Sequence, residues 1–269
     1  MKERLDVLLV EKGFFESREK AKRAIMAGII VVNDKKVDKA GTKVKVESEL
    51  RIKGTPLKYV GRGGLKLEKS IEAFELDFKD KLVLDIGAST GGFTDCALQN
   101  GARYVYSVDV GTNQLAWKLR QDSRVKSLEN MHIKNLELKE LDNNLVDYIV
   151  IDVSFISLTM VFNYLKKFLN DSGQVVALIK PQFEVGTANI SKGGIVKDFS
   201  KHIMAIEKVI NSAYENGLFI KKLDTSPITG TKGNVEYISL FDIENKNINI
   251  DIENIVEKGK KLKKGDGKK

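Results

Sequence analysis

The sequence predicts an α/β fold in which a doubly wound, mostly parallel sheet of seven strands follows a small α+β domain. An apolar run over residues 81–86 leads into a glycine-rich turn and then a helical pattern, which is how such sheets open. Beyond it, strand-length apolar runs alternate with helical patterns, so we expect helices on both faces of the sheet. Residues 1–58 instead show two short helices and short extended pieces, which indicates a separate domain.

The domain over residues 1–58 is expected to be compact and basic, with 15 Lys/Arg against 9 Asp/Glu. A short apolar helix from Leu5 ends at Gly13, and Ser17 caps a second helix that ends at Gly28. Residues 29–52 hold the extended pieces of a small hairpin sheet. Basic side chains that lie off the apolar stripe of the second helix are Arg18, Lys22 and Arg23.

The net charge of +8 is concentrated at the two ends of the chain. Residues 257–269 hold 7 Lys against 2 Asp/Glu, so basic ends flank a mildly acidic centre. Such a distribution suits a partner with a phosphate backbone. Residues 54–56, Gly-Thr-Pro, are the expected linker to a domain over 59–245, and residues 246–269 are expected to form a basic, disordered tail.

In the second domain, the linker is followed by a helix with Lys66 in its first turn, where a cation opposes the helix dipole. Such local conflicts are more expected at functional sites than elsewhere. Residues 181–197 lack periodicity and are expected to form a mobile loop over the site. The remaining expected strands cover about 104–109, 126–129, 146–152, 174–180, 218–224 and 235–242, with helices near 113–121, 157–169 and 200–215.

The glycine-rich turn indicates which nucleotide-like ligand the sheet binds. Its order, Gly87, Gly91 and Gly92, differs from the G-x-G-x-x-G of dinucleotide enzymes, and the chain has no G-x-x-x-x-G-K-[ST] loop for a nucleoside triphosphate. Asp109 ends the next strand, near the ~20-residue spacing of an acid that binds ribose hydroxyls. S-adenosylmethionine, which has no phosphate to bind, is therefore the expected ligand.

Charged residues end several of the predicted strands at one edge of the sheet, where open parallel sheets bind their ligands. Asp85, Asp109, Asp152 and Lys180 each end an apolar run. If the last strand is antiparallel, Glu236 at its beginning returns to the same edge. Of these positions, Asp152, Lys180 and Glu236 together with Lys66 predict an active site of two lysines and two carboxylates.

The composition argues against several other classes of function. One cysteine excludes an internal disulfide, and two histidines make a metal cluster or a Ser/His/Asp triad improbable, so no metal is expected. No apolar stretch is long enough to span a membrane, and charged residues follow Met1 where a signal peptide would be apolar. We therefore expect a cytoplasmic protein that does not contact a membrane.

Two resemblances extend this interpretation. Residues 4–33, including Arg4-Leu5-Asp6, Ser17-Arg18 and Val31-Val32-Asn33, resemble the RNA-binding module of ribosomal small-subunit protein four. The chain from Leu5 to about Phe241 resembles the TlyA-type rRNA 2'-O-methyltransferases, whose catalytic domain is like that of FtsJ. The motifs that carry this second resemblance are residues 61–67 (GRGGLKL), 85–93 (DIGASTGGF), 152–158 (DVSFISL), 180–184 (KPQFE) and 233–236 (GNVE).

The second resemblance implies a Rossmann-like methyltransferase sheet, S-adenosylmethionine as cofactor and a ribosomal RNA cytidine as substrate, alone or within a ribosomal subunit, with the large-subunit RNA favoured. It implies a catalytic tetrad of Lys66, Asp152, Lys180 and Glu236. The residues expected to bind the cofactor are Asp85, Gly87, Ser89, Gly91, Gly92, Phe93, Asp109 and Asn130. Those expected to bind RNA are Arg4, Ser17, Arg18, Lys22, Arg23 and Arg62.

The residue types suit this chemistry, because a ribose hydroxyl must be aligned with the methyl donor and must lose a proton. Lys180 could accept that proton only in its neutral form, which burial and the neighbouring Lys66 would favour. Asp152 would orient Lys180, and Glu236 would hold Lys66. Two other classes stay open: a non-catalytic RNA-binding ribosome-assembly factor, and a pore-forming hemolysin, a label sometimes attached to the family.

Overall fold

The computed structural model describes residues 2–33, 35–48, 50–53, 58–230, 233–246 and 248–265. The chain divides into two compact units, Met1–Leu57 and Lys58–Lys269. The boundary lies one residue from the expected one, and the expected linker at 54–56 falls outside the described residues.

The first unit packs two helices, α1 (Leu5–Glu11) and α2 (Arg18–Met26), with two small antiparallel sheets. One sheet pairs β1 (Lys2–Arg4) with β4 (Lys43–Lys45), and the other has the order β3 (Lys35–Lys36), β2 (Ile30–Val32), β5 (Leu50–Ile52). Ser17 caps α2 as expected, because its hydroxyl accepts a hydrogen bond of 3.3 Å from the Lys20 amide. The core of this unit contains Leu5, Leu8, Leu9, Ile25 and Ile30.

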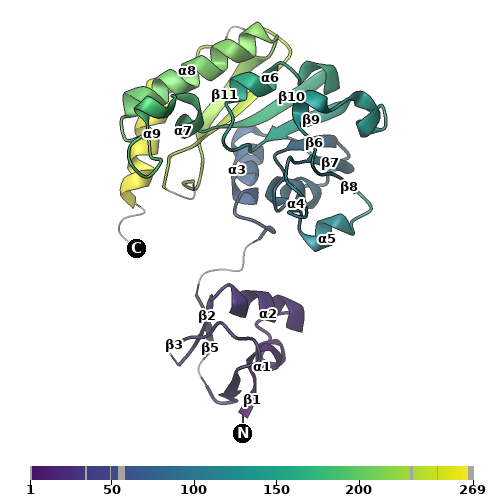
Figure 1. Ribbon diagram of the computed structural model, residues 1–269, viewed down its shortest axis with the longest axis vertical. Coiled ribbons are helices and arrows are strands. Elements are labelled where there is room, and N and C mark those ends of the chain that lie inside the picture. The colour runs from purple at the N-terminus through teal and green to yellow at the C-terminus, as the bar shows by residue number, and fades with distance from the viewer. Residues whose placement is uncertain are drawn as a thin grey trace. The chain divides into compact units, whose positions relative to one another are not determined.

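The second unit contains a seven-stranded sheet with the order β11-β12-β10-β9-β6-β7-β8 (Figure 1). Neighbouring strands from β10 to β8 are parallel, whereas β12 runs antiparallel to both β10 and β11. The mostly parallel, doubly wound sheet is thus confirmed, and the antiparallel β12 meets the condition under which Glu236 reaches the same edge. The strands are β6 (Leu82–Ile86), β7 (Tyr104–Val108), β8 (Val125–Leu128), β9 (Val146–Ile151), β10 (Leu169–Ile179), β11 (Phe219–Thr225) and β12 (Tyr237–Asp242).

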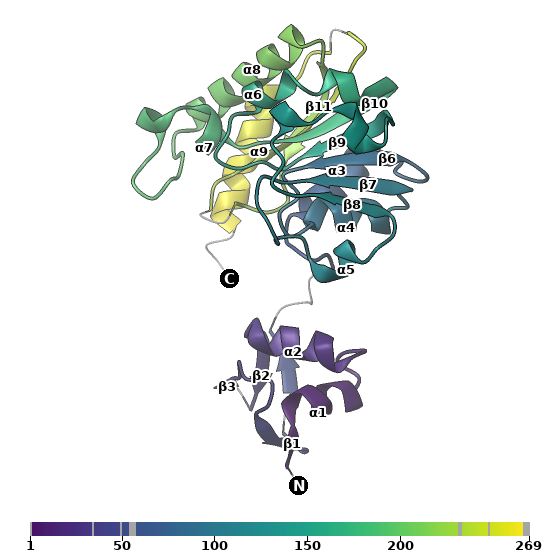
Figure 2. The same ribbon diagram turned by 45° about the vertical axis from the view of Figure 1, so that its right-hand side comes forward.

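Helices cover both faces of this sheet (Figure 2). Successive residues of a strand point to opposite faces, so Val83 packs with α3 and α4 while Leu84 packs with α6 and α8. Both neighbours are fully buried, which explains why the strands are continuous apolar runs. The helices are α3 (Gly64–Phe74), α4 (Gly92–Gln99), α5 (Trp117–Arg120), α6 (Leu158–Phe162), α7 (Pro181–Glu184), α8 (Phe199–Glu215) and α9 (Ile252–Gly265), with 3-10 turns at Ile133–Asn135, Leu138–Leu141, Lys166–Phe168 and Thr187–Asn189.

Several predicted elements differ from the observed ones. The helix expected at 157–169 is α6 followed by a 3-10 turn, and β10 already pairs with β9 at Leu169 before an irregularity ahead of Gln174. The helix expected at 113–121 is only the single turn of α5. Residues 181–197, expected to lack regular structure, begin with α7 and contain a 3-10 turn.

The expectation of a disordered tail over 246–269 is wrong for Ile252–Gly265, which form α9. Ile255 and Val256 are buried, and α9 packs on α8 and β11. The high lysine content suggested a solvated tail, but a few apolar residues at helical spacing are enough to pack an amphipathic helix on a sheet edge.

Val256→Asp should lower the free energy of unfolding by about 3 kcal/mol or more, because the new carboxylate would be buried without a partner. Urea unfolding followed by circular dichroism measures this change. Asn254→Asp places the same charge at an exposed position of α9 and should change stability little. Equal stability of the two variants would show that α9 does not dock on the sheet in solution.

Candidate active site

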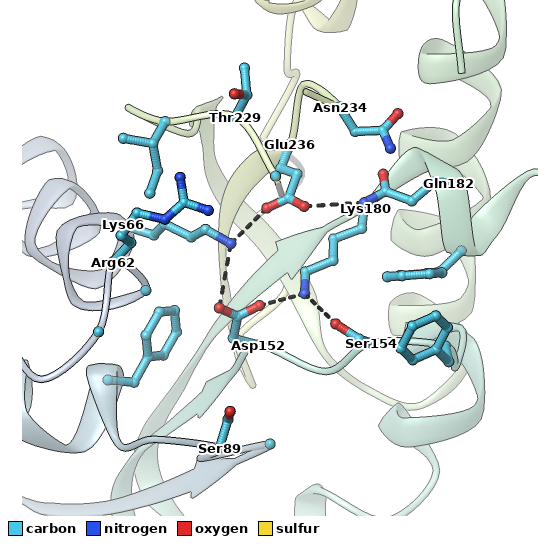
Figure 3. Close-up of a pocket in the computed structure, with 18 of the residues that line it drawn as sticks. Arg62, Lys66, Ser89, Asp152, Ser154, Lys180, Gln182, Thr229, Asn234 and Glu236 are labelled. Carbon is cyan, nitrogen blue, oxygen red and sulfur yellow. Dashed lines mark hydrogen bonds and ion pairs between the residues drawn. The ribbon is translucent and has the colours of Figure 1, made fainter. Parts of the chain in front are cut away.

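The four residues of the predicted tetrad lie together at one edge of the sheet (Figure 3). Asp152 follows β9, Lys180 follows β10, Glu236 precedes the antiparallel β12, and Lys66 lies in the first turn of α3. Lys66 Nζ is 2.7 Å from Glu236 Oε2 and 3.4 Å from Asp152 Oδ2. Lys180 Nζ is 2.5 Å from Asp152 Oδ1.

These side chains form a buried chain in which amino and carboxyl groups alternate. Lys66, Lys180 and Glu236 are 7%, 6% and 3% exposed. Burial alone would lower the pKa of Lys66, but the carboxylates of Asp152 and Glu236 outweigh it and the pKa is raised. Burial would likewise raise the pKa of Asp152, but Lys180 and Lys66 outweigh it and the pKa is lowered. Lys66 is therefore an ammonium and Asp152 a carboxylate at neutral pH.

Further polar side chains support the tetrad. Gln182 Nε2 donates to Glu236 Oε1 at 3.1 Å, and Lys180 Nζ donates to Ser154 Oγ at 3.2 Å. Gly230 leaves room for Glu236, because a Cβ at residue 230 would lie 2.5 Å from Glu236 Oε1. Sequence reasoning assigned no role to these three residues, although Ser154 and Gln182 fall within motifs that carry the family resemblance.

Two adjoining cavities meet at Asp152. The first has a volume of about 630 Å³ and contains the tetrad, with Arg62 and Thr229 at its border (Figure 3). The second has a volume of about 770 Å³ and lies over the ends of β6 and β7. Both are lined by Gly87, Ser89, Asp152, Ser154 and Phe155. A group bound in one cavity can therefore face a group bound in the other across this shared wall.

The second cavity has the features that the cofactor requires. Its walls are largely apolar, with Val108, Ile133 and Met160 among them, which suits an adenine ring. Asp109 Oδ2 accepts from the Ser89 amide and Oδ1 from the Gly111 amide, both at 2.7 Å, which fixes the carboxylate at the cavity wall. Each oxygen keeps a second lone pair with which it could accept from a ribose hydroxyl.

The predicted cofactor residues do not all line this cavity. Gly87, Ser89 and Asp109 line it, whereas Phe93 lines the first cavity instead. Asn130 is outside the lining, and its successors Met131 and His132 take that place. Gly91 and Gly92 stand at the start of α4 and do not line the second cavity. Gly92 packs closely against α3, because a Cβ on Gly92 would come within 2.9 Å of the Gly64 amide nitrogen.

Asp85 lies beneath the glycine turn and is fully buried. Its Oδ2 accepts from Thr94 Oγ1 at 2.7 Å, while Oδ1 has no hydrogen-bond partner among the described residues. Burial raises the pKa of Asp85 to about 7. This carboxyl group is therefore partly protonated at neutral pH, and its hydrogen bond with Thr94 connects β6 to α4.

Each of the expected RNA-binding residues of the first unit already has a partner, and for Arg4, Arg18 and Lys22 that partner is acidic. Arg4 and Arg18 each contact Asp6 at 3.0 Å, and these hydrogen bonds and charges lower the pKa of this buried carboxyl to about 2. The Arg4 and Arg18 side chains remain 43% and 53% exposed, so a further partner can still reach them. Lys22 pairs with Glu19 at 2.8 Å. Arg23 donates to a backbone carbonyl, and the Ser17 hydroxyl is used as the α2 cap.

The described residues contain neither a membrane-spanning helix nor a cluster of metal-binding side chains. None of their helices is both long enough and apolar enough to span a bilayer. Nor do they contain a group of three or more His, Cys, Asp and Glu side chains placed to bind a metal ion.

The fold and the paired cavities define a class of protein, the Rossmann-like methyltransferases that use S-adenosylmethionine. The chain belongs to the FtsJ-like methyltransferase family, whose model matches residues 59–242. An S4 domain model matches residues 3–50. The family resemblance deduced from the motifs is thus confirmed.

Similar proteins extend over both units. YqxC of Bacillus subtilis is 50% identical over 88% of this chain and 84% of its own length. The 16S/23S rRNA (cytidine-2'-O)-methyltransferase TlyA of Mycobacterium tuberculosis is 37% identical, covering 87% of each chain. A solved structure from Streptococcus thermophilus, described as a hemolysin, is 47% identical with a TM-score of 0.78 and covers 100% of this chain and 99% of its own.

Asp85→Asn should remove a pH dependence of stability. Because the pKa of Asp85 is raised to about 7 from 3.8, the folded chain keeps a proton between these values that the unfolded chain releases, so this group makes stability fall as pH rises through that window. Urea unfolding of the variant at several pH values should show a smaller fall. Asp171→Asn, at an exposed position, should keep the parental pH dependence, and an equal slope in all three proteins would refute the assignment.

Asp109→Ala should weaken S-adenosylmethionine binding by about tenfold or more, because the ribose hydroxyls lose a charged acceptor. Isothermal titration calorimetry measures this affinity. Asp122→Ala, outside both cavities, serves as the matched control and should bind normally. Tight binding of NAD in place of S-adenosylmethionine would contradict the assignment of the second cavity.

Proposed function

We propose that this chain transfers the methyl group of S-adenosylmethionine to the 2'-hydroxyl of a cytidine in ribosomal RNA, with the large-subunit RNA as the expected substrate. The first cavity is called the tetrad cavity from here on, and the second, which is proposed to bind the cofactor, is called the cofactor cavity. The observation that carries the proposal is the position of Asp152 on the wall that the two cavities share. The name of the Mycobacterium tuberculosis relative, which includes both 16S and 23S rRNA, supports a cytidine of ribosomal RNA as the substrate. The proposed donor and acceptor would then meet across that wall.

The acceptor hydroxyl is a weak nucleophile at neutral pH, so the enzyme must align it and take up its proton. The cofactor supplies an electrophilic methyl group on a sulfonium. Of the two tetrad amines, Lys66 is held as an ammonium by two carboxylates and cannot accept a proton. Lys180 is therefore proposed as the general base, with Asp152 orienting it and Glu236 holding Lys66.

Asp152 and Ser154 fix the position of the Lys180 amine. Lys180 Nζ lies 2.5 Å from Asp152 Oδ1, and the Lys180 side chain is buried. Lys180 must release a proton before each turnover, and the hydroxyl of Ser154 at 3.2 Å can accept a hydrogen bond from either form.

The first unit is proposed to bind ribosomal RNA through phosphate contacts of Arg4, Arg18, Lys22 and Arg23. Arg62, beside the tetrad cavity, is proposed to contact the RNA next to the target ribose. Because Arg4 and Arg18 are held by Asp6, they present a fixed cationic pair, which costs less side-chain entropy on binding than free arginines would.

A direct test is methyl transfer from labelled cofactor to ribosomal RNA and to purified subunits, followed by mapping of ribose methylation in ribosomes from cells with and without the chain. A synthetic RNA with 2'-deoxycytidine at the mapped position should accept no methyl group. RNA binding without transfer would favour a non-catalytic assembly factor, for which the S4 domain alone would suffice. Lysis of red cells by the purified protein would favour the hypothesis of a pore-forming hemolysin.

Lys180→Arg should abolish methyl transfer, because a guanidinium stays protonated and cannot accept the proton. In single-turnover reactions with saturating RNA, the parental rate should rise with pH to a plateau. Lys66→Ala, which removes the neighbouring cation, should move the midpoint of that rise upward. Lys201→Arg, outside both cavities, is the control. An active Lys180→Arg variant or a flat pH profile would leave Lys180 as a positioning residue.

Removal of residues 1–58 should abolish methylation of RNA while cofactor affinity stays unchanged, because the described residues that line the two cavities all belong to the second unit. RNA binding by the full chain should weaken steeply with salt, as expected for phosphate contacts. Filter binding at several salt concentrations measures this slope. Full activity of the truncated chain would contradict the proposed role of the first unit.

A further inference from the structure

A short hairpin over residues 191–195 forms part of the wall of the tetrad cavity. Ser191 and Ile195 pair as an antiparallel bridge, and the Ser191 hydroxyl also donates to the Ile195 carbonyl at 2.5 Å. Gly193 and Gly194 at its tip have φ values of 106° and 82°, which allow the tight turn. Ile190 and Gly194 line the tetrad cavity, so the hairpin stands beside the space where the acceptor would bind.

The hairpin is held in place from both sides at Val196. Asn234 Oδ1 accepts from the Val196 amide at 3.0 Å, and Asn234 Nδ2 donates to the Gly194 carbonyl at 2.8 Å. His202 Nε2 lies 3.1 Å from the Val196 carbonyl, and its Nδ1 lies 2.9 Å from the Tyr237 hydroxyl. Because a carbonyl can only accept, Nε2 is the donor in that bond. Asn234, Val196 and His202 are all buried.

The same stretch of chain that holds the hairpin also delivers Glu236 to the tetrad. Asn234 is two residues before Glu236, and both line the tetrad cavity (Figure 3). Tyr237, which contacts His202, follows Glu236 directly and begins β12. Val235 packs against α9, since a Cβ on Gly259 would lie 2.8 Å from Val235 Cγ1. A shift of the hairpin would therefore act on the backbone that carries Glu236.

We infer that Asn234 is a positioning residue for the acceptor side of the site, which fixes the 191–195 hairpin as a wall of the tetrad cavity and couples it to Glu236. This inference rests on the proposed function, because the acceptor is taken to be RNA. It requires that Asn234 act on the acceptor and not on the cofactor. The lining of the cofactor cavity agrees, since over the described residues it includes neither Asn234 nor any part of 185–197.

The test is Asn234→Ala, which leaves the Val196 amide and the Gly194 carbonyl without their side-chain partner. The kcat/KM for RNA should fall by about tenfold or more as the hairpin and Glu236 lose their alignment. The Kd for S-adenosylmethionine should stay within about twofold of the parental value. Trypsin cleavage after the exposed Lys192 should become about tenfold faster, because it follows the population of the open hairpin.

Asn189→Ala is the matched control, because it removes a comparable amide bond, of 2.7 Å to the Val185 carbonyl, just before the hairpin. It should match the parent in all three measurements. If Asn234→Ala does not fold, Ser191→Ala loosens the hairpin from its own side and should shift RNA kinetics and cleavage in the same direction.

Unchanged cleavage and RNA kinetics in the folded variant would overturn the inference, as would a parallel loss of cofactor affinity, which would mark Asn234 as a support of the whole site. The cleavage and cofactor measurements need no methyl transfer. Failure of this inference is therefore distinct from failure of the proposed function, which the parental chain tests alone.

Discussion

The four titratable side chains of the tetrad depend on one another, because none of them could be buried alone in its charged form without a large loss of solvation energy. Lys66 contacts both carboxylates, and Asp152 contacts both amines, so each inner charge has two opposite neighbours. Much of the surrounding structure serves to bring these groups to one edge. Three strands and the first turn of α3 converge there, although the residues are separated by up to 170 positions in the chain.

The same arrangement explains why a lysine is tolerated at the beginning of a helix. Lys66 stands where the helix dipole disfavours a cation, and no acidic residue in the first turn of α3 offsets it. The compensation comes from Asp152 and Glu236, which belong to other elements. A local conflict in the sequence is thus resolved by tertiary ion pairs, as expected where function outweighs helix propensity.

Asp152 lies on the wall shared by the tetrad cavity and the cofactor cavity. It faces the tetrad cavity with its carboxylate, and it lines the cofactor cavity at the turn where Gly87 approaches its backbone closely. A Cβ on Gly87 would lie 3.0 Å from the Asp152 carbonyl oxygen, and the φ of 84° also favours glycine. The contact between β6 and β9 therefore sets how near the two cavities come, and with it the distance over which a methyl group would travel.

The sequence by itself determined the alternation of strands and helices in the sheet, the capping of α2 by Ser17 and, given an antiparallel last strand, the convergence of the tetrad. These follow from local patterns: apolar runs, caps, glycine turns and charged residues at strand ends. The family motifs added the identity of the reaction. The same local signals missed α9, because its few apolar residues stand among charged ones. The helix is stabilised only when these residues pack against β11 and α8.

Only the tertiary structure decided which residues line the two cavities. Asn130 and Gly92 belong to the expected cofactor turns, yet neither lines the cofactor cavity, while Met131 and His132 do. Likewise, Asn234 reaches the hairpin over residues 191–195 only because β12 runs antiparallel beside β10 and brings its beginning to the site. Spacing along a chain predicts which edge of a sheet a residue reaches, but the direction of its side chain depends on packing between distant segments.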